Sequence, residues 1–435
     1  PDENQRGFDI VIGNPPYIQL QKEGGRLAKQ FENQHYQTFE RTGDIYTLFY
    51  EKGIQLLKSR GHLTYITSNK WMRAGYGESI RAFFAQYNPI KLIDLGSGIF
   101  ETATVDTNIL IIGKAQNQNH CKAADVSKIK QIDFENLAWI TLKNLGKDTW
   151  TIASDTEQRI KAKIQAKGKP LKGWDINIYR GVLTGYNEAF IIDGKKKDEL
   201  IAQDSRSAEI IKPILRGRDI KRYKAEFADL WLINTHNGVK EKGIPRIDVE
   251  KDYPAIYKHL KQFEPQLIKR QDKGDHWTNL RNCAYIQEFE KEKIVWNRIA
   301  SEKVFSLVEK GIYISDSMHF FTGNDLQFLN AIINSKLYSW LLNMIVGTAA
   351  GGNAGNSSNV KDLAVIRLDK TKQQPFVELV EQILALKKQG KGTSALEQQI
   401  DNLVYRLYDL TYDEVKVIDP DFPLSRQEYE AIRLE

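Results

Sequence analysis

Apolar and polar positions alternate along the first third of the chain in a pattern that predicts strands and helices in turn. Phe8 to Gly13 is a short apolar run closely followed by two prolines, which is typical of a buried parallel strand that enters a loop. Residues 44–57 have apolar side chains at helical spacing, and Ser59-Arg60-Gly61 is predicted to end this helix. A strand at 63–66, a helix at 78–87 and strands at 90–95 and 107–112 complete an open α/β sheet.

The pattern changes twice further along the chain. Residues 114–147 are rich in Asn, Gln and Lys, and the runs that follow predict a mixed, β-rich α+β region. These strand-like runs lie at 176–179, 189–192, 230–233, 293–296 and 311–314. Apolar positions over 376–387 and 396–410 predict an antiparallel helix pair. The predicted division is a sheet domain at 1–147, an α+β domain at 148–369 and a helical segment at 370–435.

Three polar segments are predicted to lie at the surface. Gly347 to Asn359 is a loop, either a plain linker or a segment that becomes ordered against nucleic acid. Lys195-Lys196-Lys197 is predicted to be an exposed loop tip, and Glu290 to Lys293 a solvated helix face.

Composition and charge narrow the class of protein. The chain has 435 residues, 41% of them hydrophobic, and no apolar run long enough to span a bilayer, so we expect a soluble protein with more than one domain. Its net charge is +6, but Thr156 to Ala225 alone holds 17 Lys or Arg against 9 Asp or Glu. This local net of +8 is either a solvated surface or a nucleic-acid interface, and we favour the interface.

Cysteine and histidine usage excludes other kinds of site. Cys121 and Cys283 lie far apart without metal-ligand spacing, so the sequence predicts neither a disulfide scaffold nor a zinc finger, and a reducing, cytoplasmic location fits best. The histidines are scattered, and we assign no metal.

The segment Asn14-Pro15-Pro16-Tyr17 carries the most specific chemistry in the sequence. Ligand sites in open α/β sheets lie beyond the carboxyl ends of strands, which is where this segment is expected. The Asn14 amide oxygen and the Pro15 carbonyl can accept both N–H groups of a planar amine and hold its lone pair toward an electrophilic methyl group. Pro16 fixes the backbone. Tyr17 offers a stacking surface to a base turned out of a duplex, with Phe100 as a further aromatic partner.

These residues resemble a known family. Phe8 to Tyr17, FDIVIGNPPY, is similar to motif IV of the N6-adenine DNA methyltransferases. Segments that resemble motifs V to VIII follow in order at Asp44-Ile45-Tyr46, Gly61-His62-Leu63 with Ser68 to Trp71, Ile93 to Gly96, and Phe100 with Thr107 to Ile112. Gly181 to Phe190 and Leu215 to Ile220 resemble the TaqI-like specificity domain of type IIG restriction-modification enzymes.

The resemblance implies a function and a set of partners. Methyl transfer from S-adenosylmethionine to a flipped adenine in double-stranded DNA is implied, with Asn14 also bordering the cofactor, and Tyr17 and Phe100 enclosing the base. Residues 1–147 would be the C-terminal part of the methyltransferase domain, with a partial Rossmann-like sheet, and 148–369 the target-recognition domain. The remaining cofactor motifs, and any nuclease domain, would precede Pro1, so we expect this chain to be an inactive C-terminal piece of a larger enzyme.

Other interpretations and roles stay open. Arg216, Arg218, Lys221 and Arg222 are predicted to contact DNA phosphates or a guanine. The chain as it stands could instead be a sequence-specific DNA-binding module without catalysis. A protein glutamine methyltransferase, which also uses Asn-Pro-Pro-Tyr, is a further alternative. We expect a monomer, because amphipathic helices such as those at the C-terminus most often cover a core of their own chain.

Overall fold

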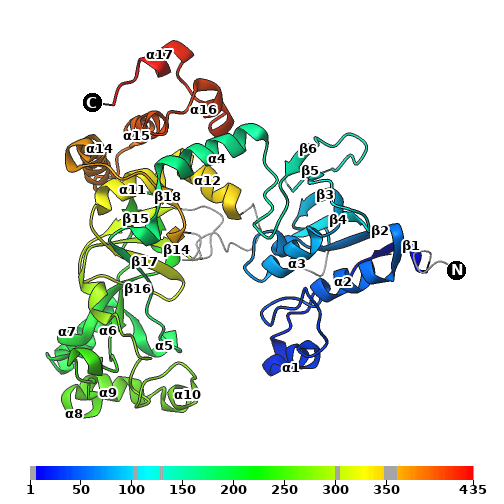
Figure 1. The fold of residues 1–435 in the computed structure, drawn as a ribbon. Coiled ribbons are helices and arrows are strands. Elements are labelled where there is room, and N and C mark those ends of the chain that lie inside the picture. The colour runs from blue at the N-terminus through cyan, green and yellow to red at the C-terminus, as the bar shows by residue number, and fades with distance from the viewer. Residues whose placement is uncertain are drawn as a thin grey trace. The chain divides into compact units, whose positions relative to one another are not determined.

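The computed structural model describes residues 6–100, 105–127, 129, 131–298, 304–346 and 360–434, which fall into two compact units (Figure 1). The first unit holds the described residues up to Arg159 together with 343–346. The second holds the described residues from Ile160 to Leu342 and from 360 onward, so the C-terminal helices belong to the same unit as the α+β region. The predicted boundaries at 147 and 369 stay predictions.

A six-stranded mixed sheet forms the first unit, in the order β1-β2-β4-β3-β5-β6. β1 is parallel to β2, β3 is parallel to β5, and β4 runs antiparallel between β2 and β3. This arrangement confirms the α/β class. The strands are β1 (Phe8–Gly13), β2 (Leu57–Ser68), β3 (Asn88–Gly96), β4 (Thr107–Gly113), β5 (His120–Asp125) and β6 (Ile140–Lys143).

The segment Ser59-Arg60-Gly61 does not end a helix, so that prediction was wrong. The helix is α2 (Tyr46–Leu56), and β2 begins directly after it at Leu57. Leu57 is buried and pairs with Phe8 of β1, and the register shifts before Ile10 pairs with His62. Gly61 is needed at this irregularity because a Cβ there would lie 2.9 Å from the Phe8 carbonyl oxygen. The breaker residues therefore mark a bulge within a strand.

Aromatic side chains fill the core on one face of this sheet. Trp71 packs edge-on against Phe84 of α3 (Gly77–Phe84) and against Trp150, with ring centroids 5.0 and 5.3 Å apart. Tyr46 and Tyr50 of α2 join the same cluster. The strand predicted at Phe8–Gly13 is present and parallel, but the prediction that it is buried was wrong, because Phe8, Ile10 and Ile12 are 60%, 64% and 78% exposed. A helix α1 (Lys22–Phe31) lies between β1 and α2 in the chain.

Two four-stranded sheets and two short strand pairs form the α+β part of the second unit, which confirms its predicted class. The sheet orders are β16-β10-β13-β9 and β15-β14-β17-β8. The strands are β7 (Lys169–Pro170), β8 (Ile176–Arg180), β9 (Ile191–Asp193), β10 (Ile211–Leu215), β11 (Ile220–Lys221), β12 (Lys224–Ala225), β13 (Leu230–Ile233), β14 (Lys293–Asn297), β15 (Phe305–Val308), β16 (Tyr313–Ile314), β17 (Met318–Gly323) and β18 (Ala364–Val365).

Helices surround these sheets and complete the C-terminal part. The predicted helix pair is confirmed as α14 and α15, joined near Gly390, whose positive φ of 70° suits glycine. α14 begins earlier than expected because the Asp369 side chain caps it by accepting from the Lys372 N–H. The helices are α4 (Asp155–Lys167), α5 (Asn187–Phe190), α6 (Gly194–Gln203), α7 (Ser207–Ile210), α8 (Val249–Asp252), α9 (Pro254–Lys261), α10 (Glu264–Lys269), α11 (Leu326–Asn334), α12 (Lys336–Val346), α14 (Lys370–Lys388), α15 (Ser394–Leu407), α16 (Tyr412–Ile418) and α17 (Arg426–Ala431).

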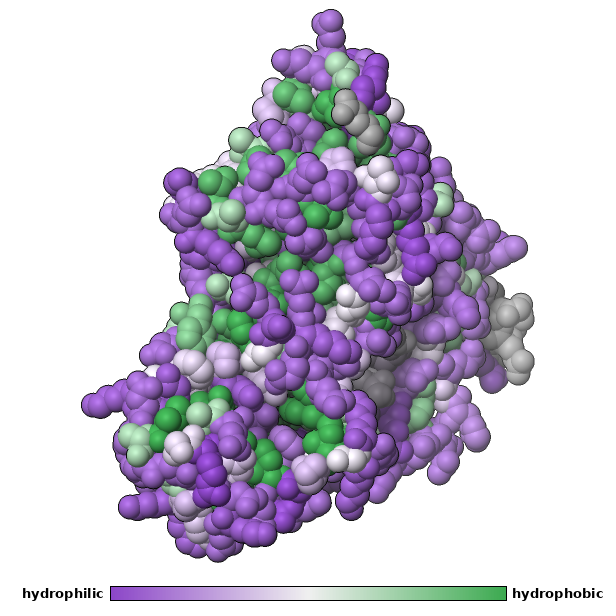
Figure 2. Space-filling view, turned by 90° about the vertical axis from the view of Figure 1, so that its left-hand side faces the viewer, coloured by the Kyte–Doolittle hydropathy of each residue, from purple (hydrophilic) through white to green (hydrophobic). Residues whose placement is uncertain are grey.

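Two predicted surface segments have a different structure. Lys195-Lys196-Lys197 forms the first turn of α6, where Asp193 caps the helix, instead of a loop tip. Residues 290–293 are not a solvated helix face, because Lys293 lies in β14 and is fully buried. Residues 347–359 lie outside the described part of the chain. In the part that is described, no helix is long and apolar enough to cross a membrane. The face of the molecule shown in Figure 2 is mostly hydrophilic, with hydrophobic residues in small groups.

Candidate functional site

The loop after β1 holds Asn14 and Tyr17 in contact with each other. The Tyr17 hydroxyl donates a hydrogen bond to Asn14 Oδ1 at 3.0 Å and lies 3.4 Å from the Ile66 carbonyl oxygen on β2. Pro15 is buried, whereas Asn14 and Pro16 are exposed. Parallel pairing of Gly13 with Tyr65 places the loop beside the carboxyl end of β2. The Asn14 amide is therefore held at the surface by a tyrosine anchored on the neighbouring strand.

Two further aromatic rings contact Tyr17. The ring of Phe100 lies 6.2 Å from it between centroids and is tilted by 58°, and the ring of Tyr46 lies edge-on at 6.3 Å. Phe100 is half-buried. The structure thus brings Asn14, Tyr17 and Phe100 together, although Phe100 lies more than eighty positions further along the chain.

Burial sets the protonation of the groups around this loop. Burial, and to a lesser extent the Asp44 carboxylate, raise the pKa of Tyr17 to about 12, so its hydroxyl stays a donor at neutral pH. Burial also raises the pKa of Asp44, which backbone N–H groups and Lys70 oppose. The loop therefore presents neutral hydrogen-bonding groups, with one carboxylate beside them.

A buried carboxylate holds the segment that leads to Phe100. Asp94 at the end of β3 is 3% exposed, and its Oδ1 accepts from Asn69 Nδ2 at 2.8 Å and from the Gly96 N–H at 3.2 Å. Arg73 lies 3.5 Å from the other carboxylate oxygen. Burial raises the pKa of Asp94, and Arg73 opposes this shift. Sequence reasoning missed this role, although both Asp94 and Asn69 stand in segments singled out as motifs.

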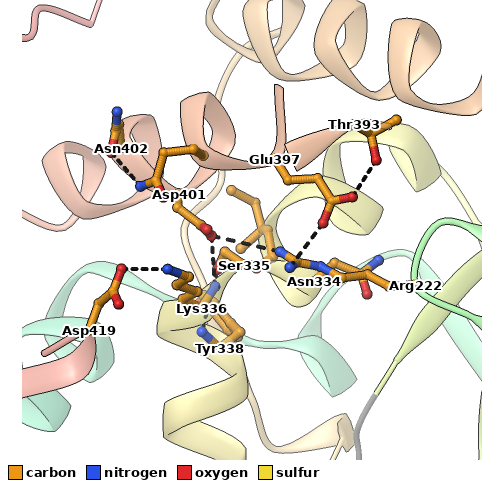
Figure 3. A network of polar contacts seen from close by, with 12 residues as sticks. Arg222, Asn334, Ser335, Lys336, Tyr338, Thr393, Glu397, Asp401, Asn402 and Asp419 are labelled. Atoms are coloured by element: carbon orange, nitrogen blue, oxygen red, sulfur yellow. Dashed lines mark hydrogen bonds and ion pairs between the residues drawn. The ribbon is translucent and has the colours of Figure 1, made fainter. Parts of the chain in front are cut away.

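The four predicted DNA contacts have two different environments. Arg216 holds Asp219 through both Nε and a terminal nitrogen, at 3.1 and 2.9 Å. Arg222 is paired with Glu397 and Asp401 (Figure 3). Arg218 and Lys221 are exposed, and their side chains make no hydrogen bond or ion pair with another described residue. The two exposed cations are thus available to a ligand, whereas the other two already hold carboxylates.

Comparison with known proteins identifies two segments of the chain. Residues 2–100 match the family model described as Eco57I restriction-modification methylase. Residues 212–355 match the TaqI-like C-terminal specificity domain. The chain thus contains one segment similar to the Eco57I restriction-modification methylases and one segment similar to the TaqI-like specificity domain. Within these matched segments lie all the predicted site residues: Asn14, Pro15, Pro16, Tyr17, Phe100, Arg216, Arg218, Lys221 and Arg222.

Individual relatives of the chain are distant in sequence. It is 27% identical over 194 residues to the type II restriction enzyme and methyltransferase RM.Eco57I of Escherichia coli, a match that covers 42% of this chain and 19% of the relative. It is 22% identical to the type II methyltransferase M.BstVI of Geobacillus stearothermophilus over 61% of this chain and 49% of the relative. The chain therefore spans less than half the length of these two relatives.

The fold as a whole has a solved counterpart. The type IIL restriction-modification enzyme MmeI, solved in complex with DNA, superimposes with a TM-score of 0.65 at 11% identity, over 97% of this chain and 57% of that chain. At this identity the likeness shows a shared fold.

Among the described residues, no cluster of His, Cys, Asp or Glu could hold a metal ion.

Proposed function

We propose that this chain is part of a site-specific DNA methyltransferase that modifies the exocyclic N6 amine of adenine. The observation that supports this most directly is the convergence of Asn14, Tyr17 and Phe100 at the carboxyl end of β1. The presence of a segment similar to the Eco57I methylases and a segment similar to the TaqI-like specificity domain in one chain supports DNA as the substrate.

The chemistry follows from the groups at this loop. The amine of adenine is a poor nucleophile because its lone pair is delocalised into the ring. Hydrogen bonds from its two N–H groups to Asn14 Oδ1 and to the Pro15 carbonyl would turn that lone pair toward a methyl donor. The Tyr17 hydroxyl, which contacts the same Oδ1, would fix the orientation of the amide. The chain's contribution is thus to position the reacting nitrogen.

Adenine must leave the duplex to reach this loop, and the aromatic rings would receive it. In the structure the rings of Tyr17 and Phe100 contact each other at a tilt of 58°. We therefore expect the Phe100 ring to turn away from Tyr17 when a base enters between them. The Asp94 network, which holds Gly96 at the start of this segment, would set the range of that movement.

We propose S-adenosylmethionine as the methyl donor. When bound, it supplies the methyl group. The described residues do not enclose such a molecule: Asn14 is exposed, and so are the apolar side chains of Ile10 and Ile12 on the strand that leads to it. We therefore propose that further residues of the longer enzyme complete the donor site.

The specificity segment would choose the DNA site. Arg218 and Lys221 are the two predicted contacts whose side chains are exposed, and they would bind phosphates or a guanine edge of double-stranded DNA. Because such binding releases counterions, it would weaken steeply with salt.

The exposed apolar residues of β1 favour a second candidate for the chain by itself. Without a complete donor site it would bind specific DNA sequences and transfer no methyl group. The same assay separates the two candidates, since DNA binding and methyl transfer are measured independently.

Transfer of labelled methyl groups from S-adenosylmethionine to duplex DNA tests the proposal. The assay compares the 435-residue chain with the longer enzyme of which we propose it is part, each as wild type, Asn14→Ala and Asn33→Ala. Asn33 is exposed in the same unit and serves as the matched control. We expect N6-methyladenine from the longer enzyme and its Asn33→Ala variant, and none from Asn14→Ala. Label on protein glutamine, or full activity of Asn14→Ala, would contradict the proposal.

A further inference from the structure

The C-terminal helices contact the β-hairpin that bears Lys221, one of the two exposed cations. β11 and β12 pair antiparallel, with Arg222 and Tyr223 forming the turn between them. Tyr223 is 1% exposed, has a positive φ of 58°, and donates its backbone N–H to the Phe305 carbonyl at 3.2 Å. A tyrosine in the left-handed region persists only where its surroundings fix it. The turn of this hairpin is therefore held inside the protein.

Arg222 joins this turn to α15. Its guanidinium lies 3.0 Å from Glu397 and 3.9 Å from Asp401, which are one helical turn apart (Figure 3). The side chains of Glu397 and Asp401 are 14% and 2% exposed, and that of Arg222 is 28% exposed. Two carboxylates with so little access to water require a cation beside them. Arg222 supplies that cation, so it is not free to pair with a phosphate.

The same carboxylates bind two other helices. Glu397 accepts from Thr393 Oγ1 at 2.6 Å and lies 3.1 Å from Lys387 at the end of α14. Asp401 accepts the backbone N–H of Lys336 at 2.7 Å, which satisfies the first turn of α12 (Figure 3). Substitution of either carboxylate would therefore remove contacts to the hairpin and to a neighbouring helix at the same time.

Two hydrogen bonds fix the turn that contains Arg218, one of the exposed cations, close to the β11–β12 hairpin that contains Arg222. The Glu226 N–H donates to the Asp219 carbonyl at 2.8 Å, and Asn297 Nδ2 donates to the Gly217 carbonyl at 2.8 Å. The first bond ties the turn at 217–219, which contains Arg218, to the residue that follows β12, and the second ties the same turn to β14. Both cations therefore keep a defined place relative to Arg222.

We propose that α14 and α15 position Arg218 and Lys221 for DNA, and that Arg222 is the positioning residue through which they act. The inference rests on the proposed function, because it assumes that the exposed cations bind DNA. It assigns a role in recognition to helices that lie beyond the matched specificity segment, which ends at residue 355.

The Glu397→Gln variant gives the sharpest test. If Glu397 acted on DNA only through its charge, Glu397→Gln would remove a repulsive anion and strengthen binding. If Glu397 holds Arg222 in place, the same change weakens binding, and we expect a loss of about tenfold. Glu378→Gln is the matched control, because Glu378 is an exposed residue of α14 whose side chain accepts a hydrogen bond from Gln374 of the same helix.

The measurement is fluorescence anisotropy of a labelled duplex DNA titrated with the 435-residue chain at several salt concentrations. Arg222→Met is compared in the wild-type chain and in a chain that also carries Arg218→Ala and Lys221→Ala. If Arg222 acts by positioning Arg218 and Lys221, its substitution no longer weakens DNA binding once those two residues are replaced. If Arg222 contacts DNA independently, its substitution weakens binding in both chains. Melting temperatures check that each variant is folded, and Arg222→Lys replaces Arg222→Met if the latter unfolds.

The possible results distinguish the positioning role of Arg222 from DNA recognition itself. Weaker binding by Glu397→Gln, unchanged binding by Glu378→Gln, and a non-additive Arg222 effect support the proposal. Equal or tighter binding by Glu397→Gln, or an Arg222 effect that persists without Arg218 and Lys221, overturns it while DNA recognition stands. A wild-type chain without salt-dependent DNA binding would overturn DNA recognition itself, and this inference with it.

Discussion

Lys293 makes the stability of the second unit depend on pH in a way that the structure predicts. It begins β14, is fully buried, and its ammonium donates to the carbonyls of Glu309 and Ile312, each at 3.2 Å. Burial lowers its pKa from 10.5 to about 8, and the negative charges of Glu290 and Glu292 partly oppose this shift. The folded protein therefore loses this proton at a lower pH than the unfolded chain does.

The direction and size of the effect follow from proton linkage. Between pH 8 and pH 10.5 the unfolded chain binds more protons at Lys293 than the folded protein does, so stability rises with pH across this window. At about 1.36 kcal/mol per pKa unit, the lowering corresponds to roughly 3 kcal/mol. Lys293→Met removes the titrating group. The free energy of unfolding of the wild type minus that of the variant should therefore increase by this amount as the pH rises through this window.

Urea unfolding of both proteins at pH 7.5, 8.5, 9.5 and 10.5 measures this difference, and the subtraction cancels the other groups that titrate. Lys291→Met is the control, because Lys291 is exposed and its contact with Glu288 raises its pKa. A raised pKa has the opposite sign, so wild-type stability should fall relative to Lys291→Met as pH rises. A difference between wild type and Lys293→Met that stays constant across this pH range would refute the assigned burial of the ammonium.

Three further predictions concern the first unit. Asn14→Ala should lower methyl transfer by the longer enzyme at least about a hundredfold, as loss of a positioned polar group does, while duplex affinity measured by anisotropy stays unchanged. Tyr17→Phe removes one hydrogen bond and should cost roughly 2- to 12-fold in kcat/KM, whereas Tyr17→Ala also removes the stacking ring and should reduce the fluorescence response of a 2-aminopurine target. Cys121 is buried and its pKa is raised to about 12, so it should resist alkylation at pH 8 until the chain is unfolded, which a mass-spectrometric time course would show.

The loop with Asn14 could be predicted from the sequence because its signals are local. An apolar run, a glycine and two prolines lie within ten residues, and the structure has a strand and a loop at those positions. The network around Asp94 could not be found in this way. Its partners Asn69 and Arg73 lie on a different element more than twenty positions away, and no spacing rule connects them. The signal present in the sequence is an acidic residue, Asp94, near the end of an apolar run that predicts a strand.

Helix and strand breakers were a less secure guide than apolar patterns. Arg60 and Gly61 have the composition of a helix end, yet the Leu57–Phe8 pair extends β2 through them. In the same way, the alternating charges of residues 290–293 are typical of a solvated helix, but β14 and β15 enclose Lys293. In both cases long-range pairing decided the local structure.

In the basic segment from Thr156 to Ala225, the net charge counted from the sequence differs from the number of unpaired cations at the surface. Of the 17 Lys and Arg between Thr156 and Ala225, ten form ion pairs with described residues. Five of the ten have partners more than eighty positions away, in Asp316, Asp362, Glu397, Asp409 and Glu414. Carboxylates brought in by the fold thus neutralise charges that appear unopposed in the sequence. The local excess therefore overstates the number of cations available to DNA, and Arg218 and Lys221 are stronger candidates than Arg216 and Arg222 because no carboxylate already pairs with them in the described part of the chain.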